Sequence, residues 1–198
     1  MADARPAEDP PRPSEGPGSG GRAPAPWSPP APEEITTARM VLEPLTPDHA
    51  GPMLPVLADP ALYAFTGGEP PTADGLRRRY ELQSAGRSPG GEESWFNWIL
   101  CTRDGSGPAG FVQATVVLGA PGPAADLAWA VGVPHQGRGL AAEAALGMRD
   151  WLSARGVRRF GAWVHPRHGA SAGVARRLGM APAPRRDADG EVRWESGG

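Results

Sequence analysis

The stretch Val131-Gly132-Val133-Pro134-His135-Gln136-Gly137-Arg138-Gly139-Leu140-Ala141 joins a predicted strand to the longest helical pattern in the chain. Apolar residues recur at helical spacing from Leu140 to Leu152. The first N–H groups of a helix have no partner within it, and the helix dipole leaves about half a positive charge there. Glycines at 137 and 139 let the backbone come close to a ligand. The stretch therefore predicts an anion site suited to a diphosphate.

Two other phosphate-binding motifs do not fit this stretch. A Rossmann dinucleotide site requires a third glycine, where Ala142 stands, and an acidic residue about 20 positions further on. A P-loop requires Gly-Lys-Ser/Thr, and the chain contains no lysine. Both alternatives are excluded by the residues present.

Strand and helix patterns alternate on both sides of this turn. β-branched and apolar runs predict strands at 35–45, 95–101, 110–118, 124–133 and 158–165. Helices are predicted from Thr46 to Ala58, interrupted by prolines, from Thr72 to Leu82 and from Ser171 to Leu178. This order indicates a layered α/β or α+β sheet.

Proline concentrates at the start of the chain. The 198 residues include 28 Gly and 25 Pro, and 10 of the prolines lie between Met1 and Glu34. That segment has few large apolar side chains and cannot offset its chain entropy by burial. We therefore predict a disordered tail over residues 1–34 and one domain over residues 35–195. Deleting the tail should leave folding unchanged.

Composition excludes several other classes of protein. A net charge of −2 does not suggest nucleic-acid binding, and no apolar run approaches the roughly 20 residues of a membrane span. The N-terminal residues lack the apolar segment of a secretory signal, and the single Cys101 suits a reducing compartment. No residues have metal-ligand spacing. We expect a cytoplasmic protein without a metal and without nucleic-acid or membrane partners.

The turn at 136–141 resembles the acyl-CoA signature of the GNAT superfamily of N-acetyltransferases, Gln/Arg-x-x-Gly-x-Gly/Ala. Here the residues are Gln136-Gly137-Arg138-Gly139-Leu140-Ala141. The opening Ala38–Leu45 is similar to the first strand of the branch that holds the ribosomal-protein alanine acetyltransferases (RimJ/RimL type). The resemblance covers about residues 37–182 and is most specific between Asp126 and Met180.

This resemblance implies a fold and a cofactor site. The fold is a mixed, mostly antiparallel central sheet flanked by helices and splayed between the fourth and fifth strands. Acetyl-CoA would bind at the splay, with pantetheine hydrogen-bonded to the backbone at Val131 and Val133. A backbone N–H near Val131 or Gly132 would hold the oxyanion. The diphosphate would contact the residues of the signature, namely Gln136, Gly137, Arg138, Gly139, Leu140 and Ala141.

Candidate catalytic residues also follow from the resemblance. Many relatives protonate the departing thiolate with a Tyr on the last helix, and Ala175 stands at that position. Ser171, in the Asn-x-x-Ser pattern of the RimJ/RimL branch, is the predicted substitute, and a hydrogen bond at the helix start is the other role that fits it. His168 replaces the Asn of that pattern, which normally contacts pantetheine. The candidate bases are Asp126, Glu69 and a water chain with no single base.

The implied activity is transfer of an acetyl group from acetyl-CoA to a primary amine, by direct transfer in a ternary complex. The acceptor would be a protein N-terminus or a small-molecule amine, and a homodimer is compatible with the family. Ala175 and His168 leave an alternative, a catalytically weak or inactive acyl-CoA-binding module. A third hypothesis is a scaffold whose proline-rich tail recruits partners.

Overall fold

An eight-stranded sheet forms the centre of the protein, in the order β1-β2-β3-β4-β5-β6-β8-β7. The computed structural model describes residues 27–196. All neighbouring strands are antiparallel except β5 and β6. The strands are β1 Ile35–Thr36, β2 Met40–Pro44, β3 Glu93–Thr102, β4 Gly107–Val117, β5 Ala124–Val131, β6 Arg159–Val164, β7 Met180–Arg186 and β8 Val192–Ser196.

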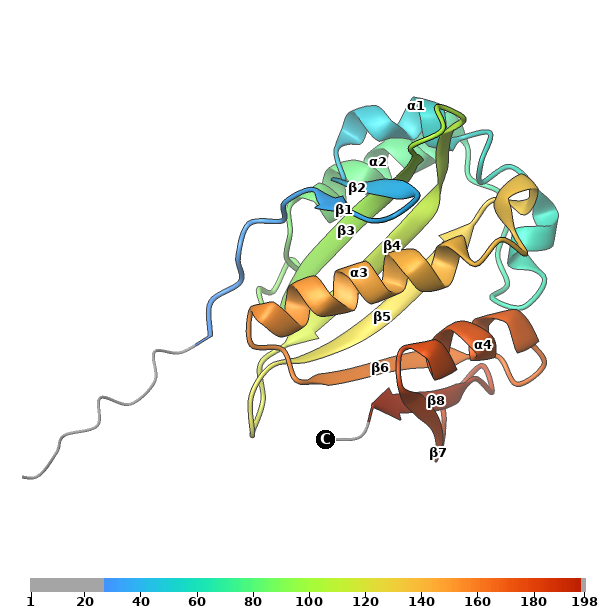
Figure 1. Ribbon diagram of the computed structural model, residues 1–198. Helices are drawn as coiled ribbons and strands as arrows, with labels where there is room; N and C mark the ends of the chain where they lie inside the picture. Colours follow the sequence, from blue (N-terminus) through green and yellow to red (C-terminus); the bar gives the residue numbers. More distant parts are fainter. Residues whose placement is uncertain (1–26, 197–198) are drawn as a thin grey trace, which may run out of the picture.

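Helices cover both faces of the sheet (Figure 1). On one face, α1 (Ala50–Met53) and α2 (Ala73–Ser84) enclose a hydrophobic cluster that includes Leu76 and Ile99. On the other, α3 (Leu140–Ala154) and α4 (Gly169–Arg177) cover a larger cluster that includes Leu127 and Met148. Within residues 27–196, no helix has the length and apolar character needed to cross a membrane.

β5 and β6 pair over only three residues. Ala124, Ala125 and Asp126 pair with Arg159, Phe160 and Gly161, although β5 continues to Val131 and β6 to Val164. Figure 1 shows the two strands side by side at one end and apart at the other. The sequence predicts β1 and β2 as a single strand. β5 and β6 are therefore the fourth and fifth strands of that prediction. The predicted splayed, mostly antiparallel sheet is confirmed.

Threonine precedes the first turn at both of the first two predicted helices. The Thr72 hydroxyl accepts a hydrogen bond from the Gly75 N–H at 3.1 Å and caps α2. After Thr46, the chain forms a 3-10 turn over Pro47–His49 and then α1. The helix predicted to reach Ala58 therefore ends at Met53, because proline lacks the N–H that a longer helix requires.

One strand prediction is wrong in part, and two strands of the sheet are missing from the prediction. The first predicted strand is a hairpin, because the chain turns between β1 and β2, where the Thr37 N–H donates to the Met40 carbonyl at 2.8 Å. β7 and β8 were not predicted at all. β7 contains Pro182 and Pro184, which lower strand propensity, and the sheet tolerates them because β7 is an edge strand.

The predicted tail boundary at residue 34 is also wrong, because the segment from Trp27 to Glu34 contacts the body of the fold. The Trp27 indole N–H donates to the Arg155 carbonyl at 2.8 Å, and the Trp98 indole N–H donates to the Glu33 carbonyl at 2.8 Å. Glu33 also forms an ion pair with Arg155 at 2.9 Å. Average composition does not detect a segment that is held by a few long-range hydrogen bonds. The rest of the predicted tail, residues 1–26, lies outside the described residues.

Candidate active site

A cleft of about 290 Å³ opens where β5 and β6 separate. Thr115 and Asp126 line it and are paired neighbours on β4 and β5. Their side chains alternate with those of the core beneath α3, so they lie on the opposite face of the sheet. Ser171 and His168 line the cleft from the start of α4. The cleft thus joins residues that are far apart in the sequence.

The backbone of β5 presents polar groups to this gap. The Gly132 N–H donates to the Ala109 carbonyl on the β4 side at 2.8 Å. Along an antiparallel strand, every second residue is hydrogen-bonded to the neighbouring strand. Because Gly132 is bonded to the β4 side, Trp129 and Val131 direct their N–H and C=O groups to the opposite edge of β5. There β6 has separated from β5. Of the two oxyanion donors predicted from the sequence, Gly132 is occupied, and Val131 faces the gap.

The start of α3 carries N–H groups without an internal acceptor. Gly137 and Gly139 have φ values of 71° and 77°, which are costly for other residues. Within residues 27–196, no side chain caps α3, and the Glu143 N–H is the first to be paired, with the Gly139 carbonyl at 3.1 Å. The N–H groups of Leu140 and Ala141 precede it and remain available to an anion.

Gln136 supports the turn from within. Its side-chain amide donates to the Val131 carbonyl at 3.0 Å, and its backbone N–H donates to the Val133 carbonyl at 3.2 Å. Both donor groups of Gln136 therefore have partners in the protein. Gln136, which the sequence predicts to contact the diphosphate, also links the end of β5 to the glycine turn.

His168 starts α4. Its Nδ1 accepts a hydrogen bond from the Ser171 N–H at 3.5 Å, so His168 occupies the N-cap position of the helix. Burial and then the nearby His165 lower the pKa of His168, which favours the neutral ring that can accept this bond. Phe65 stacks on His168 with the ring centroids 4.5 Å apart. The loop that contains Phe65 therefore lies against the start of α4.

Three carboxylates near this region differ in their surroundings. Asp126 forms an ion pair with Arg193, whose side chain is only 14% exposed. Glu191 lines the cleft and has no ion pair within the described residues. Burial and then the charge of Asp187 raise the pKa of Glu191, and His165 opposes this. Glu69 is exposed in its loop and lies outside the lining of the cleft.

The structure thus brings Asp126, Ser171 and His168 together and leaves Glu69 apart. Glu191 is absent from the residues predicted from the sequence, because it follows the turn of the unpredicted β7–β8 hairpin. The Asp-Ala-Asp-Gly sequence just before Glu191 is a turn signal that could have identified it. Ala175, at the position of the family tyrosine, is fully buried.

Comparisons with known proteins agree with this geometry. A family model described as "Acetyltransferase (GNAT) domain" matches residues 39–181. No curated protein sequence matches the chain. Solved structures do match, although sequence identities this low show the fold alone.

Three solved structures illustrate the similarity. RimL, a ribosomal L7/L12 alpha-N-protein acetyltransferase, has a TM-score of 0.66 at 15% identity, over 82% of this chain and 93% of that chain. A second RimL structure, in complex with coenzyme A, has a TM-score of 0.64 at 14% identity, over 82% and 95%. An acetyltransferase from Agrobacterium tumefaciens has a TM-score of 0.64 at 22% identity, over 85% and 96%.

The family model covers most of the described chain, including the splayed strands and the glycine turn before α3. The unpaired N–H groups at the start of α3 suit a negatively charged group such as a diphosphate. The chain therefore belongs to the GNAT family and is an acetyl-CoA-dependent acetyltransferase.

Proposed function

We propose that this acetyltransferase transfers the acetyl group of acetyl-CoA to a primary amine, by direct attack in a ternary complex. The observation that carries the proposal is the short pairing of β5 and β6. Trp129 lines the cleft that this leaves, the Val131 N–H is directed to the same edge of β5, and β5 leads from there to the glycine turn. A long thioester has polar partners along this whole path.

The residues of this path suit the separate parts of acetyl-CoA. The N–H groups from Gly137 to Ala141 bind the diphosphate, and Arg138 adds a positive charge near it. The backbone at Val131 and Val133 binds the pantetheine arm. The Val131 N–H donates to the carbonyl oxygen of the thioester as that oxygen becomes negative.

The acceptor amine must lose a proton before it attacks. We assign the base to Glu191, because it lines the cleft without an ion pair in the described residues and has a raised pKa. Asp126 is instead engaged in an ion pair with Arg193, and Glu69 lies outside the cleft lining. A water chain with no single base is the remaining alternative. Two carboxylates at the cleft also favour an acceptor that arrives as an ammonium.

The departing thiolate of coenzyme A needs a proton, and Ser171 is the proposed donor. Its hydroxyl lines the cleft and makes no hydrogen bond to the described residues, which argues against a role in capping. The cap is supplied by His168 instead. The N-terminal end of α4 adds a positive dipole that stabilises a nearby thiolate.

A thiol-release assay with acetyl-CoA tests this function directly. The acceptors are N-terminal peptides, polyamines and aminoglycoside-type amines, which represent the two acceptor classes that the sequence left open. We expect thiol release that depends on one class of added amine. Release no greater than the hydrolysis background with every amine would contradict the proposal.

The buried Ala175 and the Asp126–Arg193 ion pair favour one alternative, an acyl-CoA-binding module with little catalysis. Tight binding of acetyl-CoA without amine-dependent turnover would support that alternative. Comparing wild type with Ser171→Ala separates the two functions, because the alanine variant should lose turnover while it keeps coenzyme A affinity.

A further inference from the structure

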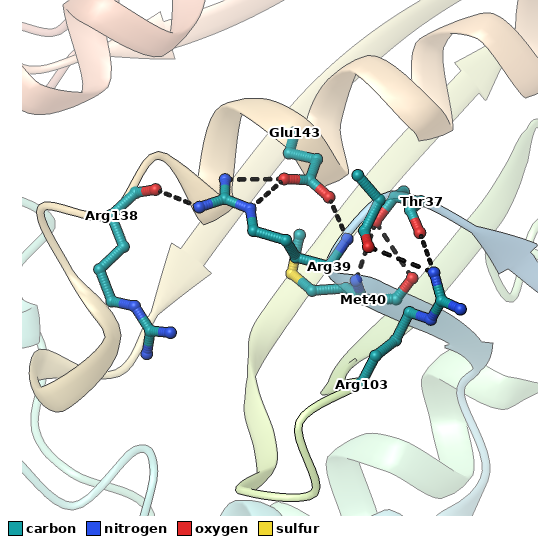
Figure 2. Close-up of polar contacts among 7 residues, drawn as sticks. Thr37, Arg39, Met40, Arg103, Arg138 and Glu143 are labelled. Carbon is teal, nitrogen blue, oxygen red and sulfur yellow. Dashed lines mark hydrogen bonds and ion pairs between the residues drawn. The ribbon is translucent and has the colours of Figure 1, made fainter.

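The turn between β1 and β2 reaches across to the start of α3 (Figure 2). One guanidinium N–H of Arg39, at Nη1, donates to the Arg138 carbonyl at 2.8 Å. The Arg39 Nε donates to Glu143 Oε2 at 2.7 Å, and the Arg39 backbone N–H donates to Glu143 Oε1 at 2.8 Å. A single residue thus holds both the glycine turn and the first turn of α3.

We propose that Arg39 is a positioning residue, which sets the glycine turn and the charge around it for the diphosphate of coenzyme A. This inference rests on the proposed function in one respect, that the diphosphate binds at the start of α3. Arg39 itself does not need to touch the ligand, because its donor groups are directed at Glu143 and Arg138.

The bond to the Arg138 carbonyl fixes one peptide of the turn. In a planar trans peptide, the C=O and the following N–H point in opposite directions. Holding the Arg138 carbonyl toward Arg39 therefore sets the direction of the Gly139 N–H. This peptide joins Arg138 to Gly139, and Gly139 resists its rotation less than any other residue type would. The restraint that this glycine lacks is supplied by Arg39.

The contacts with Glu143 control the charge at the same place. Burial alone would raise the pKa of Glu143, but the nearby polar groups of Thr37 and Arg39 outweigh it and lower the pKa. The ionised carboxylate stabilises the start of α3 through the helix dipole. It would also repel a diphosphate bound to the same turn of the helix. Arg39 offsets this repulsion, with Nη2 at 2.7 Å from Glu143 Oε2.

Arg103 provides a matched control in the same cluster. It donates to the Thr37 and Ala38 carbonyls at 3.3 and 3.2 Å and so supports the turn that carries Arg39. Figure 2 shows its side chain directed at this turn, on the side away from Arg138. An Arg103→Ala variant therefore removes a guanidinium from the same cluster and leaves the contacts to α3 in place.

Calorimetry on the full chain tests the proposal with two ligands, coenzyme A and pantetheine, which lacks the diphosphate. Pantetheine affinity is measured by competition against coenzyme A. We expect Arg39→Ala to weaken coenzyme A binding by about 10- to 100-fold, the size of one or two lost charged hydrogen bonds, and to change pantetheine binding by less than about twofold. Arg103→Ala should change either affinity by less than about twofold.

A second variant separates positioning from general support of the fold. The double variant Arg39→Ala/Glu143→Ala should recover part of the coenzyme A affinity, about three- to tenfold, because the repelling carboxylate is gone. A purely structural role for Arg39 predicts a further loss instead. Arg39→Lys keeps the charge but cannot bridge both Glu143 and the Arg138 carbonyl. Its affinity for coenzyme A should therefore lie between those of wild type and Arg39→Ala.

Each outcome bears on a distinct claim. If Arg39→Ala loses affinity for coenzyme A and pantetheine equally, or keeps the wild-type affinity for coenzyme A, the inference is overturned and the proposed function still stands. A wild-type chain that binds no coenzyme A would overturn both.

Discussion

Arg193 on β8 crosses over Gly161 of β6 to reach Asp126 on β5, with 2.5 Å between the guanidinium Nη2 and the carboxylate Oδ1. Asp126 and Gly161 are the last pair before β5 and β6 separate. A Cβ at Gly161 would overlap the Arg193 guanidinium, so the ion pair depends on the absence of a side chain there. The ion pair therefore joins β8 to β5 at the point where the strands separate and places a positive charge beside Asp126.

This arrangement predicts unequal effects for the two cleft carboxylates. Glu191→Gln should lower kcat by about 10²- to 10⁴-fold, the contribution typical of a general base, whereas Asp126→Asn should cost about tenfold or less. Steady-state kinetics with the best amine from the thiol-release assay measures both. A larger loss for Asp126→Asn than for Glu191→Gln would reverse the assignment.

The pH dependence of kcat/KM provides an independent check of Glu191. Its pKa is raised by burial and by Asp187, so the base is protonated at a higher pH than an ordinary glutamate. Activity should therefore fall on the acid side, with a midpoint above the usual glutamate pKa of about 4.3. Glu191→Gln should remove that acid limb. An unchanged profile in the variant would assign the limb to another group.

His168 should make the stability of the protein depend on pH. The N-cap bond requires an unprotonated Nδ1, and the pKa of His168 is lowered in the folded state, first by burial. Its stabilisation is therefore present above the ordinary histidine pKa of about 6.5 and is lost as pH falls through the lower folded pKa.

The matched variant His168→Asn keeps an acceptor at the cap but does not titrate. Between pH 7.5 and pH 5, wild type should lose about 0.5 kcal/mol more of its free energy of unfolding than His168→Asn does. Urea denaturation at the two pH values measures this difference. If both proteins lose the same amount, His168 does not control the start of α4.

Two truncations test the segment that precedes β1. A chain that starts at Trp27 keeps the Trp27–Arg155 and Trp98–Glu33 hydrogen bonds, and a chain that starts at Ile35 loses both. We expect the shorter chain to be less stable by about 2 kcal/mol, from lost burial of the Trp27 ring and the unpaired Trp98 indole N–H. Equal urea midpoints would restore the domain boundary predicted from the sequence.

Local signals in the sequence predicted the elements around the cofactor site. The turn from β5 to α3 depends on glycines at fixed positions and on apolar spacing, and both are visible in one short stretch. The cap at Thr72 and the interruption of the first helix by proline are equally local. These features need no knowledge of distant contacts.

Features made by distant residues were not predictable in this way. The Arg39–Glu143 contacts join residues 104 positions apart, and Arg193 reaches Asp126 from 67 positions away. Glu191 enters the cleft only because β8 pairs with β6. A single sequence does not reveal these pairings, because they depend on which elements pack together and, for β6 and β8, on the register of the two strands.

The most direct test of the account is a calorimetric titration of coenzyme A into wild type, Gly139→Val and Gly51→Val. Gly139 has a φ of 77°, which valine strongly disfavours, whereas Gly51 lies in α1 with open space around a Cβ. We predict that wild type and Gly51→Val bind coenzyme A alike and that Gly139→Val binds at least about tenfold more weakly. No heat with wild type, or equal affinity in all three proteins, would contradict the claim that the start of α3 binds the diphosphate.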